Sequence, residues 1–547
     1  MVLSFILAIF GISSYTSANT ISIQDTVLNQ VESTLPKGHN NEPQQFTILS
    51  NTTHAVVAKP IASSKQRFFI RHIEIDNLPA QLDFLRAFIK EKTNRAYGLA
   101  EINQLAYELN TKLATKGYVT SKVYVDPQSL SSGDLRLSLM LGTVGGIRFT
   151  GASGNYSNAL GFHTGDILSI RSIEQTVDNL NSVLHQRAKV SLEPGSKLGE
   201  TIVVFHMESG SRFEVQTGVD TFGNEGTGRL QANATISVAK PFKHSDMLYY
   251  STTKAVPGDD TKGSRSTYLS YQIPVGYDTF TYSHAYSNYE QRISYAINPF
   301  ISSGHFTMDT FSWTHVLHRN RLVKTEIINT IMHKIRHSFI NGNEIDVQKR
   351  RTTTWEVDVH QTRYITNGML DWKLAYIRGM HWWADPGPTD AIGDATTKYN
   401  LYVGTATYTK QFPLDAKYKW TYRLEIKGQY TPSHLYASEF FNLGGWYAVR
   451  GYSGDNNLSA EKGFYVRNTV ELPTSPINTV YLGVDYGKVS GHYSSELLGQ
   501  ELAGGVIGVK GQYQNISYNL FGAYPFSKPE GFIVPNALLG LQLNITL

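Results

Sequence analysis

The chain contains no cysteine. Disulfides, thiolate nucleophiles and cysteine-based metal sites are therefore excluded. Charged residues make up 17% of the chain, below the roughly 25% usual for soluble domains, and the apolar fraction of 41% does not compensate. The formal net charge is only +4, and no long basic run with interleaved aromatic residues occurs. Nucleic-acid binding therefore has little support.

Long apolar runs are also missing. The run at residues 2–10 is too short for a membrane-spanning helix, and no later stretch reaches the required length of about 18 residues. It leads into the small residues Thr16, Ser17 and Ala18, so residues 1–18 are predicted to be a signal peptide, although the usual positive start is absent. Only helices and closed barrels satisfy the backbone in lipid, so a membrane location would require a barrel.

Aromatic residues are abundant, at 12% of the chain with 33 tyrosines. A tyrosine ring has one apolar and one polar end, which suits a membrane interface. From residue 211 onward the hydrophobic pattern has a period of two. Phe213 and Val215 alternate with Glu214 and Gln216, and the last segment, residues 539–547, has leucine or isoleucine at every second position.

Alternating segments of about ten residues separated by turns are typical of transmembrane barrels, whereas strands of soluble sandwiches usually have five to six residues. At about 20 residues per strand and connection, residues 210–547 are predicted to form about sixteen antiparallel strands. A barrel of that size has an aqueous interior, so something must keep it from leaking.

The region before the barrel is predicted to hold a helix, a linker and two small domains. Apolar residues at helical spacing predict an amphipathic helix at residues 19–35, and residues 36–66 are polar, rich in proline and without a period. Residues 67–142 show the order strand, helix, helix, strand, strand, and a similar order returns in residues 143–209. In the first of these units, alternation predicts strands at residues 69–75 and 119–125, and the second helix, with leucines at helical spacing, is predicted to end at Gly117. A recurrence of about 70 residues is too long for a solenoid repeat, so two α+β domains in series are predicted.

Four features give the chain its resemblance to a known family. The first is this order of parts, with a helix-to-strand junction at residues 117–123. The second is the start of the barrel at residues 217–246, which includes Asp220 and the run Gly226-Thr227-Gly228. The third and fourth are the runs LGGWYAVRGY at residues 443–452 and LGVDYG at residues 482–487. Over nearly the whole mature chain it resembles the transporters of two-partner secretion, the TpsB proteins of the ShlB/FhaC/HecB type.

The resemblance implies roles for particular residues. The two small domains would be POTRA domains, and the helix at residues 19–35 would be a plug in the lumen. The motif Val449, Arg450, Gly451 and Tyr452 would lie at the tip of a long extracellular loop folded back into the lumen. Asp485, on a strand with Gly483, would face the lumen and meet Arg450, and Gly444 and Gly445 would let the loop turn. Leu547 departs from the family pattern, since many outer-membrane barrels end in an aromatic residue.

The implied function is secretion of a partner exoprotein from the periplasm to the cell surface, also called type Vb secretion. We expect an outer-membrane protein with periplasmic N-terminal domains and no catalytic, cofactor-binding or metal-binding residues. Its expected partners are a TpsA-type exoprotein (a β-helical adhesin, haemolysin or toxin), outer-membrane lipid and, for its own insertion, the barrel-assembly machinery and periplasmic chaperones.

Two other functions stay open at this point. One is an insertase that assembles other barrels, but its relatives usually carry more POTRA domains than the two that fit here. The other is an outer-membrane enzyme or a small-solute channel, which would leave the two periplasmic domains unexplained.

Overall fold

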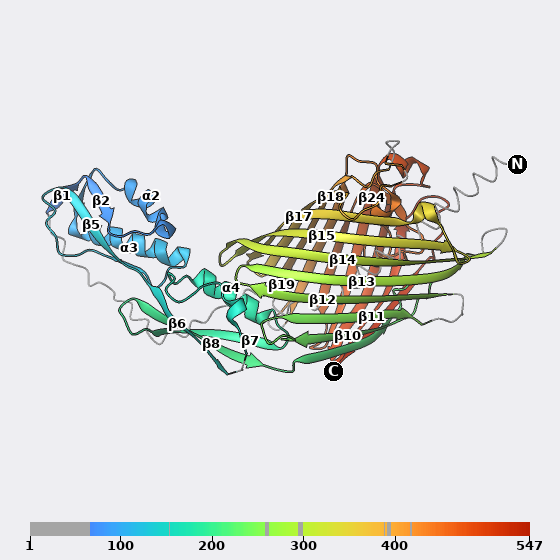
Figure 1. Cartoon of the computed structure of the whole chain (residues 1–547), viewed down its shortest axis with the longest axis horizontal. Helices are drawn as coiled ribbons and strands as arrows, with labels where there is room; N and C mark the ends of the chain where they lie inside the picture. Colours follow the sequence, from blue (N-terminus) through green and yellow to red (C-terminus); the bar gives the residue numbers. More distant parts are fainter. Residues whose placement is uncertain are drawn as a thin grey trace.

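A computed structural model describes residues 66–151, 154–256, 262–293, 299–387, 389–390, 395–415 and 418–547. The predicted signal peptide, plug helix and linker, apart from residue 66, lie outside the described residues. Two small α+β domains precede a large barrel, and Figure 1 shows the two domains as an arm at one end of the barrel. No helix among the described residues is long and apolar enough to cross a membrane.

The first domain packs two helices on one face of a three-stranded sheet. The sheet order is β2-β5-β4, with β2 parallel and β4 antiparallel to β5, and a separate ribbon pairs β1 with β3. The elements are β1 (Arg67–Ile70), β2 (His72–Ile75), η1 (Ala80–Leu82), α2 (Phe84–Lys90), β3 (Arg95–Gly98), α3 (Leu99–Lys116), β4 (Lys122–Tyr124) and β5 (Asp134–Met140).

The sequence interpretation of this domain was wrong in three details. The predicted strand at residues 69–75 is broken at Arg71, because its first part pairs with β3 and its second part pairs with β5. The strand β3 was not predicted, since its four residues carry no alternating pattern. The strand predicted at residues 119–125 is also shorter, at Lys122–Tyr124.

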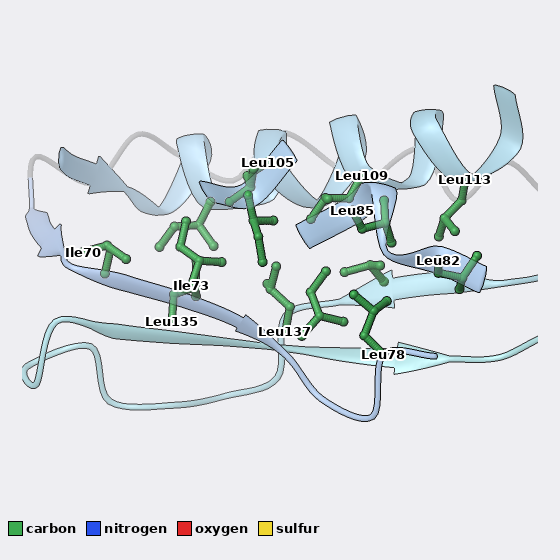
Figure 2. Close-up of a cluster of buried hydrophobic side chains, with 14 of the residues drawn as sticks. Ile70, Ile73, Leu78, Leu82, Leu85, Leu105, Leu109, Leu113, Leu135 and Leu137 are labelled. Carbon is green, nitrogen blue, oxygen red and sulfur yellow. The ribbon is translucent and has the colours of Figure 1, made fainter. Parts of the chain in front are cut away.

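The core of the first domain follows from the spacing of leucines in α3. One stripe of the helix is buried, and Figure 2 shows Leu105, Leu109 and Leu113 pointing from α3 toward the sheet. At the helix start the Glu101 carboxylate accepts a hydrogen bond of 2.7 Å from the Gly98 N–H. This bond holds the pKa of Glu101 below its usual range. Gly117, at a φ of 100°, ends the helix as predicted.

The second domain has one long helix on a three-stranded sheet of order β6-β8-β7, with β6 parallel and β7 antiparallel to β8. One face of the helix packs on the sheet through Ile173, Val177 and Leu180. Polar side chains on other faces, among them Glu174, Gln175 and Asn179, are buried as well. The elements are β6 (Thr143–Gly151), η2 (Ser157–Ala159), α4 (Ile170–Asn181), β7 (Gln186–Pro194) and β8 (Glu200–Ser209).

The remaining chain forms a closed antiparallel barrel, and the prediction of about sixteen strands is confirmed. Sixteen strands within the described residues form the wall, the short β16 (Asn343–Glu344) extends one hairpin, and β27 pairs with β9 to close the ring. The wall strands are β9 (Phe213–Asp220), β10 (Gln231–Ala239), β11 (Met247–Ala255), β12 (Gly263–Val275), β13 (Asp278–Ile293), β14 (Phe300–Arg319), β15 (Val323–Ile340), β17 (Arg350–Ile365), β18 (Gly368–Met380), β19 (Asn400–Pro413), β20 (Lys419–Tyr430), β23 (Lys462–Pro473), β24 (Asn478–Ser490), β25 (Glu501–Tyr513), β26 (Ile516–Ser527) and β27 (Leu538–Thr546).

The buried polar face of α4 is explained by the barrel, which lies beside it in Figure 1. Arg319, at the end of β14, places Nη1 2.6 Å from an Asp178 carboxylate oxygen and Nε 3.6 Å from Glu174. The Asn179 amide donates a bond of 2.6 Å to the carbonyl of Gly276, in the turn after β12. The second domain is therefore docked on the barrel where β12 and β14 end.

We predict that Arg319→Met loosens this joint without unfolding the barrel, because Asp178 loses its cation and Glu174 keeps only Arg171 of its own helix. We expect a loss of about 1–2 kcal/mol, less than the roughly 3–5 kcal/mol of a fully buried pair, since Asp178 is partly exposed. Hydrogen exchange of the α4 amides should become faster. Arg321→Met, two residues further on, is the matched control, and equal α4 exchange in both variants would contradict the docking role.

Candidate functional site: a loop held inside the barrel

One long connection of the barrel folds inward. Residues 431–461, here named the inward loop, join the neighbouring wall strands β20 and β23. The loop forms a short hairpin from β21 (Phe441–Leu443) and β22 (Leu458–Ala460). Residues 444–457, between the two hairpin strands, are here named the loop tip. Side chains of the hairpin and of the loop tip form an apolar cluster with wall residues Val489 and Leu502. The loop therefore packs against the inner side of the wall at β24 and β25.

Strand alternation places Asp485 on the lumen side of the wall. In β24 the side chains of Leu482, Val484 and Tyr486 are exposed on the outer face, while the intervening Asp485 is fully buried. The strand carries one inward carboxylate between outward apolar residues. The period of two in the sequence is thus the direct cause of the carboxylate's position.

The carboxylate of Asp485 is bound by Arg450 at the tip of the inward loop. The guanidinium binds it in a bidentate manner, with Nη2 2.6 Å from Oδ1 and Nε 2.7 Å from Oδ2. The backbone N–H of Arg450 donates a third bond of 2.9 Å to Oδ2. Arg450 Nη2 also donates to Thr469 Oγ1 at 3.0 Å and to the Asn468 carbonyl at 3.2 Å, both on β23. The Asp485 carboxylate thus accepts three hydrogen bonds, and Arg450 connects the two wall strands β23 and β24.

The energetics of this pair favour a positioning role. Two unit charges about 4 Å apart attract by roughly 4 kcal/mol at an effective dielectric near 20. Desolvation offsets much of that gain, whereas removal of one partner leaves an uncompensated buried charge and costs about 3–5 kcal/mol. A second arginine, Arg467, has its Nε 4.0 Å from Asp485 and its Nη1 3.3 Å from Glu425. The pair therefore determines where the loop tip lies more than it stabilises the barrel.

Glycines make room for the arginine. Gly483 lies two residues before Asp485 on β24. A Cβ on Gly483 would lie 2.8 Å from Arg450 Cζ and closer still to Nη2. Gly451 has a φ of 114°, and a Cβ there would lie 2.6 Å from the Tyr524 carbonyl oxygen. Any larger residue at either position would push the loop tip off the wall.

The other predicted residues of the loop motif are buried around this pair. Val449 and Tyr452 lie in the apolar cluster of the hairpin, and the Tyr452 hydroxyl is 2.6 Å from the Ser527 carbonyl oxygen. Gly444 and Gly445 have φ angles of 103° and 109° at the end of β21. The structure thus brings the tip residues together with Gly483 and Asp485, while the glycine pair lies at the start of the tip.

Sequence reasoning missed several residues of the site. Thr469 and Arg467 lie on the inner face of β23 and contact Arg450 and Asp485, respectively. The alternation of β23 was a usable signal for their orientation, but the register of the strand has no local signal. Lys334 of β15, which binds Glu439 of the inward loop, has no sequence signal because 105 residues separate the two.

Three sequence profiles match successive parts of the chain. An ShlB-type POTRA domain profile matches residues 68–142, a POTRA domain profile matches residues 143–194, and the profile of haemolysin secretion/activation protein ShlB/FhaC/HecB matches residues 199–511, more than half of the chain. The chain belongs to this family. It is an outer-membrane transporter of two-partner secretion, and its two POTRA domains lie in the periplasm.

Relatives with the same architecture are found by sequence and by structure. Outer membrane transporter CdiB-2 of Burkholderia pseudomallei is 29% identical over 84% of this chain and 80% of its own length. Haemolysin transporter protein ShlB of Serratia marcescens is 25% identical over 71% and 70%. The solved structure of CdiB from Acinetobacter baumannii superposes with a TM-score of 0.84 at 25% identity, over 97% of this chain and 99% of its own.

We predict that Gly483→Ala displaces Arg450 from Asp485, because the new methyl group would occupy the space of the guanidinium. The loop tip should become accessible to added protease in intact outer membranes, at unchanged barrel level. Gly522→Ala on β26 is the matched control, since a Cβ there meets only Leu539, at 3.9 Å. Equal protease resistance in both variants would show that a methyl group at position 483 does not displace Arg450.

Proposed function

We propose that this transporter secretes an unfolded TpsA-type exoprotein, a β-helical adhesin, haemolysin or toxin, through the lumen that the inward loop occupies. The observation that carries the proposal is the buried Arg450–Asp485 pair, which holds a removable element inside a wide barrel. A loop held by ion pairs and apolar contacts, and not by covalent bonds, can leave when a client replaces those contacts. The transport needs no catalytic residue and no cofactor.

The POTRA domains would capture the client on their sheet edges. Within the described residues β7 is an outer strand of the second sheet and β4 is an outer strand of the first. An extended peptide can add to such an edge, where backbone hydrogen bonds supply affinity with little demand on sequence. This mode suits an unfolded client, and the docking of the second domain on the barrel would place the captured peptide beside the lumen.

The remaining parts of the proposal concern closure and energy. The predicted plug helix at residues 19–35, outside the described residues, would close the lumen together with the inward loop and leave with it. Folding of the client at the cell surface would supply the driving force, since neither ATP nor a proton gradient is available at the outer membrane. The barrel-assembly machinery and periplasmic chaperones would serve the transporter's own insertion.

We predict that Arg450→Ala lowers secretion at least severalfold while the barrel still assembles, because Asp485 loses the bidentate partner that sets the loop position. The measurement is client in the culture medium at equal levels of heat-modifiable barrel. The matched control is Arg423→Ala, which removes an arginine of the wall strand β20 and leaves Arg450 in place. Unchanged secretion in Arg450→Ala would reject the role of the pair.

A deletion strain tests the proposed client class. Proteomes of medium, cell surface and outer membrane are compared with and without the gene. We expect one large exported protein to disappear from surface and medium while other barrels keep their levels. A joint fall of many outer-membrane barrels would instead show an insertase, and no change in either would contradict dedicated secretion.

A further inference from the structure

The inward loop has a second set of contacts, far from its tip. Residues 431–440, here named the first leg, run from the end of β20 to the hairpin. Leu435 is almost fully buried in an apolar cluster with Tyr399 and Leu401, and Phe440 packs against the same cluster. The Thr431 hydroxyl donates a bond of 2.6 Å to the Asn400 carbonyl. The first leg is therefore packed on the wall at β19.

An ion pair extends this attachment to a distant strand. Lys334 Nζ on β15 lies 3.2 Å and 3.5 Å from the two carboxylate oxygens of Glu439. Three strands, β17, β18 and β19, separate β15 from β20, where the inward loop begins. The side chains are 22% and 13% exposed, so water screens their attraction only in part. Glu439 therefore connects the loop to a part of the wall remote from Asp485.

Tyr436 adds two contacts to the same region. The Arg350 guanidinium lies over the Tyr436 ring at 4.6 Å, in cation–π geometry. The Tyr436 hydroxyl oxygen accepts a hydrogen bond from the Thr389 N–H and lies 2.8 Å from Thr389 Oγ1. A Cβ on Gly387 would collide with the Tyr436 hydroxyl, so a glycine there makes room for this ring. The connection between β18 and β19 thus contacts the first leg.

We propose that Lys334 and Glu439, supported by Arg350 and Tyr436, form a second anchor. This anchor holds the first leg against the barrel wall independently of Arg450 and Asp485. The inference rests on the proposed function, in which the inward loop must leave the lumen. The tip is attached at β23 and β24, and the first leg at β15 and β17. Loss of the tip anchor alone therefore frees the tip and leaves the first leg attached to the wall, and full opening requires release at both places.

A charge-exchange cycle on the full-length transporter tests this proposal. Lys334→Glu, Glu439→Lys and the double exchange are made in the wild-type and in an Asp485→Asn background, and conductance is recorded in planar bilayers. Each single variant should raise the frequency of large openings by about fivefold, as expected for loss of a partly buried ion pair. The double exchange should restore the wild-type frequency, because the pair forms with reversed charges.

A matched control separates the anchor from luminal charge. Lys324→Gln and Lys334→Gln each remove one lysine from β15, but Lys324 pairs with Glu326 of the same strand and not with the loop. Only Lys334→Gln should change the openings. Equal effects of the two, or a double exchange that behaves like the single variants, would overturn the second anchor.

The Asp485→Asn background distinguishes a failure of the proposed function from a failure of the second anchor. If Asp485→Asn itself leaves conductance unchanged, the proposed role of the inward loop fails. If it acts while every Lys334 and Glu439 variant matches its parent, only the second anchor fails.

Cross-linking gives a second test should charge reversal prevent assembly. The chain has no cysteine of its own, so a Lys334→Cys, Glu439→Cys pair is unique. A cleavable thiol cross-linker should abolish large openings in the Asp485→Asn background, and cleavage should restore them. Large openings that persist in the cross-linked protein would overturn the proposal.

Discussion

The arrangement inside the barrel depends on one buried carboxylate. Asp485 is fully enclosed, and an enclosed charge is tolerated only when it is paired and hydrogen-bonded. Arg450 supplies the bidentate partner, and the loop tip must lie where its guanidinium reaches both oxygens. Gly483 leaves the space for that guanidinium, and β23 supplies two further acceptors for its Nη2. The position of the loop follows from the requirement to satisfy this single group.

A wide lumen explains why the loop is held by a few contacts at its ends. A sixteen-stranded wall encloses more space than its own inward side chains fill, so a separate segment must occupy the interior. The inward loop forms apolar clusters with the wall, and its polar contacts are ones that water can replace. Such a segment is located accurately when it is in place, and its release requires a client that replaces both kinds of contact.

The sequence predicts those parts of the structure that depend on local periodicity. The period of two predicts the wall strands, and the leucine stripe predicts α3, with Gly117 at its end. Register and long-range pairing have no local signal, so the break at Arg71 and the strand β3 were missed. The pairing of Lys334 with Glu439 was missed for the same reason, because neither residue differs from any other luminal charge until the loop is folded. The Arg450–Asp485 contact was expected from the family resemblance alone.

In the second POTRA domain, buried polar residues of α4 contact the barrel. Glu174 and Asn179 are buried polar residues on a helix whose own domain needs only the apolar stripe. Some of their partners lie in the domain itself, since Glu174 binds Arg171 and Asn179 donates to the Ala159 carbonyl. Arg319 and the Gly276 carbonyl of the barrel add further partners, so the same side chains also orient the domain on the barrel. Each contact is polar and directional, which sets the orientation of the domain more narrowly than an apolar patch of equal area would. A domain that hands a peptide to a fixed lumen requires such an orientation, since a peptide released at a variable angle would miss the opening that the inward loop vacates.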